Sequence, residues 1–116
     1  MELLEELEGL GVNVNEGVER LMGNASLYVK MLGMFVNMMR TSEVSPDFDG
    51  NDYKDMIEKA HAVKGAAGNL SITPVYEAYT EIVNLLRADQ PEQARAVLKK
   101  ILPLQADIIQ CIERYR

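Results

Sequence analysis

Apolar residues recur at intervals of three and four along most of the chain, which is the spacing of one face of an α-helix. Four long segments follow this pattern and predict helices over residues 27–40, 51–70, 73–88 and 91–115. No segment alternates apolar and polar residues between turn-forming dipeptides, as a strand would. The pattern therefore predicts an all-α protein.

Capping residues and prolines set the expected ends of the long helices. Either Asn24 or Ser26 can cap the first, and residues 41–50 are rich in turn formers and predict a loop. Thr73-Pro74 and Asp89-Gln90-Pro91 each place a cap before a proline, which is a typical helix start. Short connections of this kind favour antiparallel neighbours.

Two short amphipathic segments precede the long helices. Residues 2–8 predict a helix ended by Gly9 and Gly11, and a second is expected from a cap at Asn15 to Met22. Pro103 predicts a kink or break within the last helix. The expected architecture is an up-and-down antiparallel four-helix bundle with one or two short N-terminal helices, forming a single domain over residues 1–116.

Each long helix has an apolar face for the core. The expected core positions are Tyr53, Met56, Ile57, Ala60, Val63 and Ala67 in the second, Val75, Ala78, Tyr79, Ile82, Leu85 and Leu86 in the third, and Ala94, Val97, Leu98, Ile101, Leu104, Ile108, Ile109 and Ile112 in the last. The first helix has more apolar residues than one core face requires. The surplus either docks a partner or lies under the short N-terminal helices. Its apolar residues are Leu27, Tyr28, Met31, Leu32, Met34, Phe35, Val36, Met38 and Met39.

Composition narrows the classes of function. A net charge of −6 and a pI near 4.8 argue against binding to nucleic acid or to an anionic membrane. No apolar run is long enough to span a membrane and the first residues are acidic, so a cytoplasmic protein is expected. Cys111 is the only cysteine, which excludes an intrachain disulfide. A zinc site at His61 and Cys111 would lack two ligands, so no metal site is expected.

His61, the only histidine, lies on the flank of the second long helix. A helical wheel places it about a third of a turn from the centre of the core stripe, half exposed. Lys54, Glu58, Lys64, Gly65 and Gly68 share this flank. Glycine within a helix costs about 0.5 to 1 kcal/mol relative to alanine. Packing or helix termination explains Gly68 as well as function does, whereas Gly65 leaves a bare surface that another protein could approach.

The motif His61-x-x-Lys64-Gly65-x-x-Gly68-Asn69 resembles the signature of histidine-containing phosphotransfer (HPt) domains. Residues 12–21, with Tyr28 and Phe35, are similar to the N-terminal segment and first bundle helix of that family. The resemblance covers roughly residues 10–88. This chain departs from the family pattern at residues 71–73 and at Ile82-Val83. These departures leave open which side chain, Glu81 or Asn84 among the candidates, bonds the imidazole.

The resemblance implies a phosphoryl shuttle in a two-component signalling system. His61 would be the phosphorylated nucleophile, and Lys64 would neutralise phosphate charge, with help from Lys54. The implied partners are response-regulator receiver domains and a hybrid histidine kinase. The implied docking residues are Lys54, Glu58, Gly65, Gly68 and Asn69. The receiver would bring Mg²⁺, so this chain would bind no cofactor, have no ATP-dependent kinase activity and act as a monomer.

Three other hypotheses remain. A noncatalytic helical adaptor would keep the bundle and the motif but only bind a receiver or kinase. A structural four-helix module would use its glycines for packing, and His61 would be dispensable. A metal-binding bundle is disfavoured, because such bundles pair two Glu-x-x-His motifs and Glu58 with His61 forms only one.

Overall fold

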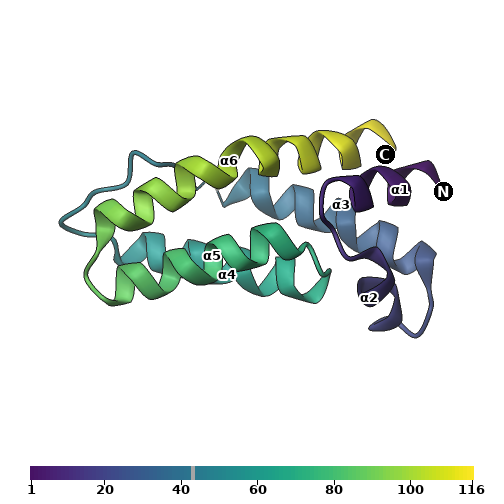
Figure 1. Ribbon diagram of the computed structural model, residues 1–116, viewed down its shortest axis with the longest axis horizontal. Helices are drawn as coiled ribbons and strands as arrows, with labels where there is room; N and C mark the ends of the chain where they lie inside the picture. The colour runs from purple at the N-terminus through teal and green to yellow at the C-terminus, as the bar shows by residue number, and fades with distance from the viewer. Residues whose placement is uncertain (43) are drawn as a thin grey trace.

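Helices and their connections make up the chain (Figure 1), and no strand is found in the part that the structure describes. The structure is a computed structural model that describes residues 1–42 and 44–116. The expected all-α class is confirmed for these residues. Glu43, in the expected loop 41–50, lies outside them. The helices are α1 (Glu2–Gly9), α2 (Val14–Glu19), α3 (Ala25–Thr41), α4 (Lys54–Asn69), α5 (Thr73–Arg87) and α6 (Pro91–Arg114).

The four long helices pack side by side in an elongated body of 44 × 25 × 23 Å. α4 packs against α5 and α5 against α6, while α3 contacts both α6 and α4. The two short helices lie at one end, with α1 beside the C-terminal part of α6 (Figure 1). This packing is that of a helical bundle, because each long helix buries one face against its neighbours.

The core consists mostly of the residues that the apolar pattern predicts. Met56, Ala60, Val63 and Ala67 of α4 are buried, whereas Tyr53 and Ile57 are half-buried. In α5 and α6 the expected positions are buried or half-buried as well; the buried ones are Val75, Tyr79, Ile82, Leu86, Ala94, Leu98, Ile101, Ile108 and Ile112. The pattern did not predict a buried polar pair, in which the Tyr79 hydroxyl donates to Oε1 of Gln105 over 2.6 Å. Burial raises the pKa of the Tyr79 hydroxyl.

α1 ends at Gly9, as the sequence predicts, whereas α2 begins and ends at other residues than predicted. α1 includes Gly9, and the chain turns at Gly11, where φ is +94°. The N-cap of α2 is Asn13, so the prediction of Asn15 was wrong. The Asn13 side chain accepts from the backbone N–H of Glu16 and donates to its carboxylate, and this reciprocal pair fixes the helix start. α2 ends at Glu19, and Met22 lies outside it with a φ of +57°.

The connection between α3 and α4 is longer than predicted. α4 begins at Lys54, so the expected helix start at Asn51 was wrong. The Asp49 side chain accepts from the backbone N–H of Asn51, a local turn that competes with the helix. Tyr53 is the N-cap, and its hydroxyl donates to Asp89 in the α5–α6 link. Residues 51–53, predicted as the first helical turn, instead make contacts within the α3–α4 loop and with the α5–α6 link.

Proline stands near the start of α5 and does not end α6. Pro74 stands in the first turn of α5, as expected, but Thr73 is already helical and Ile72 is the N-cap. α6 continues through Pro103, so the predicted break is wrong, and the kink stays a prediction. Pro103 and Lys99, whose carbonyl loses its partner, are both exposed, so water can bond this carbonyl and the helix tolerates the proline.

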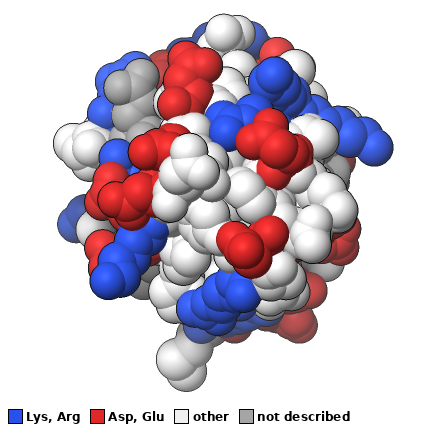
Figure 2. All heavy atoms as spheres, turned by 90° about the vertical axis from the view of Figure 1, so that its left-hand side faces the viewer, with Lys and Arg blue, Asp and Glu red and all other residues white. Residues whose placement is uncertain are grey.

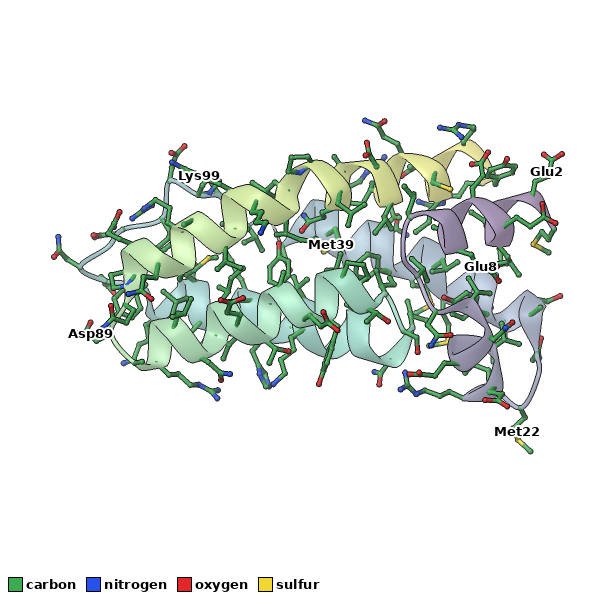
Figure 3. All side chains as sticks on the ribbon, in the orientation of Figure 1. Glu2, Glu8, Met22, Met39, Asp89 and Lys99 are labelled. Carbon is green, nitrogen blue, oxygen red and sulfur yellow. The ribbon has the colours of Figure 1, made fainter. Side chains whose placement is uncertain are left out.

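Most of the apolar surplus of α3 is covered. Tyr28, Leu32, Phe35, Val36 and Met39 are buried, and Met31 and Met38 are half-buried against the core. α2 is one of the elements that contact α3. Leu27 and Met34 stay exposed. Figure 3 shows Met39 inside the bundle and Met22 pointing away from it at the α2–α3 link.

The two ends of the body are held by charged residues. At one end, Arg114 pairs with Glu6 over 2.9 Å and ties α6 to α1. At the other, Arg95 stacks 4.3 Å above the Phe48 ring, pairs with Glu92 and donates to the Phe48 carbonyl, which ties the α3–α4 loop to α6. Figure 2 faces this second end and shows both signs of charge interspersed. None of the helices in the described residues is long and apolar enough to cross a membrane.

Candidate functional site

The exposed flank of α4 carries the histidine. Ala60 and Ala67 are fully buried and fix the inner face of the helix. His61, next to this face, is exposed, as is Gly65 one turn later, whereas Lys64 is half-buried. The position of His61 follows from helical geometry, and the imidazole is accessible to another molecule.

A surface hollow of about 640 Å³ lies beside His61. It is formed by α2, the flank and last turn of α4, the α4–α5 link and the start of α5. Five predicted site residues line it together, namely His61, Lys64, Gly65, Gly68 and Asn69. The other lining residues are Asn13, Glu16, Arg20, Ser71, Thr73, Tyr76 and Glu77.

Two predicted docking residues do not line this hollow. Lys54, at the start of α4, borders a separate depression with Tyr53 and Asp89. Glu58 is exposed, one turn before His61. Of the expected docking surface, the part C-terminal to His61 therefore forms one concave surface, and the N-terminal part does not belong to it.

Gly65 is bare and open. A Cβ placed on it would meet no described atom within 4 Å outside its own stretch of helix. No neighbouring element therefore requires glycine at this position, and close packing within the chain does not explain it. The free space lies one helical turn from His61, where a partner could approach the imidazole.

Gly68 has a packing role. A Cβ there would lie 2.9 Å from Cδ1 and 3.0 Å from Cε1 of Tyr76. The aromatic ring of α5 thus rests directly on the α4 backbone at this point. Tyr76 is 39% exposed, so it also forms part of the surface of the hollow. The packing interpretation holds for Gly68, and the two glycines of the motif differ in what surrounds them.

α2 is attached to the C-terminal end of α4 by a polar network. Arg20 donates through one nitrogen to the carbonyl of Gly68 and, over 2.7 Å, to Oγ of Ser71. Its other nitrogen pairs with Glu16 over 2.6 Å, and the Ser71 hydroxyl donates to the same carboxylate over 2.9 Å. The backbone N–H of Asn13 donates to the Ser71 carbonyl over 2.9 Å. These bonds form the α2 side of the hollow.

A close approach of backbones supports this attachment. A Cβ on Gly17 would lie 2.5 Å from the Tyr28 ring and 2.8 Å from the Leu70 carbonyl oxygen. Tyr28, fully buried, donates its hydroxyl to that same carbonyl over 2.7 Å. Only glycine lets α2 lie this close to α3 and to the end of α4.

Lys64 is the least neutralised cation of the hollow. No ion pair of Lys64 is found among residues 1–42 and 44–116, whereas Arg20 is paired with Glu16. Glu77 of α5 adds a carboxylate to the lining. An anion bound near His61 would therefore meet one available ammonium group and would have to avoid the acidic side.

No described residue fixes the orientation of the His61 imidazole by a hydrogen bond. None of the side-chain hydrogen bonds found in residues 1–42 and 44–116 involves the His61 imidazole, and Glu81 and Asn84 are exposed on α5 outside the lining of the hollow. Glu77, four residues before Glu81, lines it instead. The periodicity of α5 places these two on one face, so the sequence contained a signal for Glu77. Nothing comparable pointed to Arg20, whose i, i+4 spacing from Glu16 indicates only a surface pair.

Groups of three or more His, Cys, Asp or Glu side chains that could hold a metal ion are not found in the described part of the chain. No protein-family model, no curated protein and no solved structure matches this chain.

Proposed function

We propose that this protein is a histidine phosphotransfer protein of a multistep phosphorelay, which carries a phosphoryl group between receiver-domain aspartates on His61. The observation that supports it most is the open space at Gly65 beside an exposed imidazole. Glycine in a helix is unfavourable, and neither packing nor helix termination accounts for it here. Access by a large partner does account for it.

The chemistry of an imidazole suits this transfer. The lone pair of neutral Nε2 attacks the phosphorus of an aspartyl phosphate, the P–N bond forms, and the bond from phosphorus to the aspartate oxygen breaks. The carboxylate leaves with the bonding electrons, and Nδ1 keeps its proton. The return step reverses these events on the aspartate of a second receiver.

Phosphoryl transfer requires in-line positioning and neutralisation of the equatorial oxygens. Lys64, three residues after His61 and without an ion pair in the described chain, supplies one positive charge. Mg²⁺ held by the receiver supplies the rest, together with the phosphoryl group. The chain thus contributes half of a composite active site, and its hollow receives a protein surface and not a nucleotide.

The proposal extends to fold topology and setting. α3, α4, α5 and α6 form an up-and-down antiparallel four-helix bundle of the HPt kind, with α1 and α2 as the short extra helices. The protein acts as a cytoplasmic monomer, with a hybrid histidine kinase and response-regulator receivers as partners. Gly65, Gly68, Asn69 and Lys64 contact the receiver, and Glu58 and Lys54 lie at the margin of that contact.

The test is transfer from receiver domains of the source organism that have been charged with acetyl phosphate. The purified chain should acquire phosphate that is labile in acid and stable in alkali, and His61→Gln should acquire none. Lys64→Ala should slow transfer, whereas Lys99→Ala, an exposed lysine on α6, should not. Label that survives in His61→Gln would refute the site.

A noncatalytic adaptor is the competing outcome. If the protein is an adaptor, the wild type and His61→Gln should bind a receiver with equal affinity. No charged receiver should transfer phosphate to either protein. Binding measured by calorimetry on both proteins separates the two functions.

A further inference from the structure

Arg20 makes contacts that the proposed transfer does not use. Arg20 is the C-cap residue of α2, and among the described hydrogen bonds it is the only side chain that reaches both the carbonyl of Gly68 and the hydroxyl of Ser71. Its pairing with Glu16, and that of Ser71 with the same carboxylate, close a ring of polar contacts. One guanidinium thus joins α2, the last turn of α4 and the α4–α5 link.

The C-terminal end of α4 favours a cation such as Arg20. Carbonyls at the end of a helix lack intrahelical donors, and the negative end of the helix dipole favours a cation. α4 has no basic residue in its own last turn. Arg20, 48 residues from Gly68 in sequence, supplies this charge and a second donor to the Gly68 carbonyl, which also accepts from the backbone N–H of Ser71. A planar guanidinium can serve several acceptors at once, which the single ammonium group of lysine does less well.

Arg20 acts at one wall of the hollow and not at the imidazole. Gly68 follows His61 by seven residues, about two helical turns. The Tyr76 ring rests on Gly68 and is partly exposed in the same hollow. The position of the last turn of α4 therefore determines where the Tyr76 ring lies. A partner that reaches His61 would meet this wall.

We propose that Arg20 is a positioning residue, which holds the wall formed by Gly68 and Tyr76 in the shape that the incoming receiver domain contacts. This inference rests on the proposed phosphotransfer function. The phosphoryl group itself stays on His61, and Arg20 affects docking without touching the reacting atoms.

The functional experiment compares a small and a large phosphoryl donor. Phosphoramidate loses ammonia when Nε2 attacks its phosphorus and needs no docking surface, whereas a receiver charged with acetyl phosphate does. Arg20→Ala should be phosphorylated by phosphoramidate at the wild-type rate. With the receiver as donor, KM should rise about tenfold with little change in kcat. Arg20→Lys should resemble Arg20→Ala, because it keeps the charge but not the planar fork.

Arg114→Ala is the matched control. Arg114 also pairs with a glutamate of a short helix, Glu6 of α1, but it lies away from the hollow. Arg114→Ala should be phosphorylated by each donor at the wild-type rate. Circular dichroism should show that all variants keep their helices. If Arg20→Ala fails to fold, Arg20→Lys and Arg20→Gln are used to compare phosphoramidate with the charged receiver as donors.

A structural measurement decides the inference without any receiver. The backbone N–H groups of Ser71 and Ile72 donate to the carbonyls of Gly68 and Ala67. Their hydrogen exchange should be about tenfold faster in Arg20→Ala than in wild type, and unchanged in Arg114→Ala.

Three results would overturn the inference. Equal losses with both donors would mean that Arg20 acts on His61. Full receiver-dependent transfer by Arg20→Lys would mean that charge alone suffices. Unchanged amide exchange would mean that Arg20 does not fix the turn. By contrast, failure of the wild type to accept phosphate from either donor would refute the proposed function, and amide exchange would still test the role of Arg20.

Discussion

The exposed flank of α4 contains two stretches that differ in one respect. Around His61 and Gly65 the helix is open, and a side chain added at Gly65 would meet nothing. Around Gly68 it is closed, because the Tyr76 ring and the polar network of Arg20 lie against the backbone. The same residue type therefore serves access at one position and packing at the other, three residues apart. Sequence spacing alone does not separate these two roles.

Filling the open stretch should have the largest effect. Gly65→Trp should leave the unfolding free energy close to that of wild type, because the space around this position is empty. Transfer from a charged receiver should fall by about 100-fold, because the indole holds the partner away from His61. Single-turnover labelling measures the rate, and urea unfolding measures the stability. Unfolding of Gly65→Trp would show that this stretch is packed after all.

Crowding the contact between α2 and the end of α4 should reduce the stability of the protein and not the access to His61. Gly17→Ala places a methyl group against the Tyr28 ring and the Leu70 carbonyl, and should destabilise the protein by about 2 kcal/mol. Gly9→Ala is the control, because no described atom lies near that position. Urea unfolding of both variants tests the contrast. Equal stability of the two would mean that α2 moves away at little cost.

Tyr28, whose hydroxyl bonds the Leu70 carbonyl at the end of α4, should make the stability of the protein sensitive to alkaline pH. Burial raises the pKa of its hydroxyl from 10.0 to about 12, so the native state holds this proton more tightly than the unfolded state. The resulting stability is complete below pH 10 and is lost as the pH rises toward 12. Tyr28→Phe should cost about 1 kcal/mol at neutral pH through the unbonded Leu70 carbonyl. Between pH 10 and 12, its stability should decline less than that of wild type, and an equal decline would assign the effect to other groups.

Single methyl groups should give the smallest effects on stability, and these should differ between Gly65 and Gly68. Gly65→Ala should stabilise the protein by about 0.5 to 1 kcal/mol, because alanine is the better helix former and has room. Gly68→Ala should gain less or lose stability, because it displaces the Tyr76 ring. In a Tyr76→Ala background, Gly68→Ala should regain the full benefit. Thermal unfolding of the four variants checks this, and equal gains at both glycines would remove the distinction.

Helical periodicity and capping patterns in the sequence predicted the helices and most of the core. They did not predict features that depend on contacts between residues far apart in the sequence. The core stripes followed from helical periodicity because each long helix has one buried face. Helix ends were less predictable: Asn13 and Asn15 are equally good caps by type, and the bond from the Asn13 backbone to Ser71 favours the first. The half of the site on α4 could be predicted, because His61, Lys64 and Gly65 lie within two turns. Arg20 and Tyr76 could not, since their roles depend on packing between α2, α4 and α5.

The attachment of α2 also bears on the order of folding. α4 and α5 are joined by a short link, so their pairing closes only a small loop. The bonds of Arg20 to Gly68 and of Tyr28 to Leu70 join residues 48 and 42 positions apart, and closing such loops costs more chain entropy. Contacts of this length tend to form late. We therefore expect the helix that carries His61 to be in place before the hollow beside it is complete.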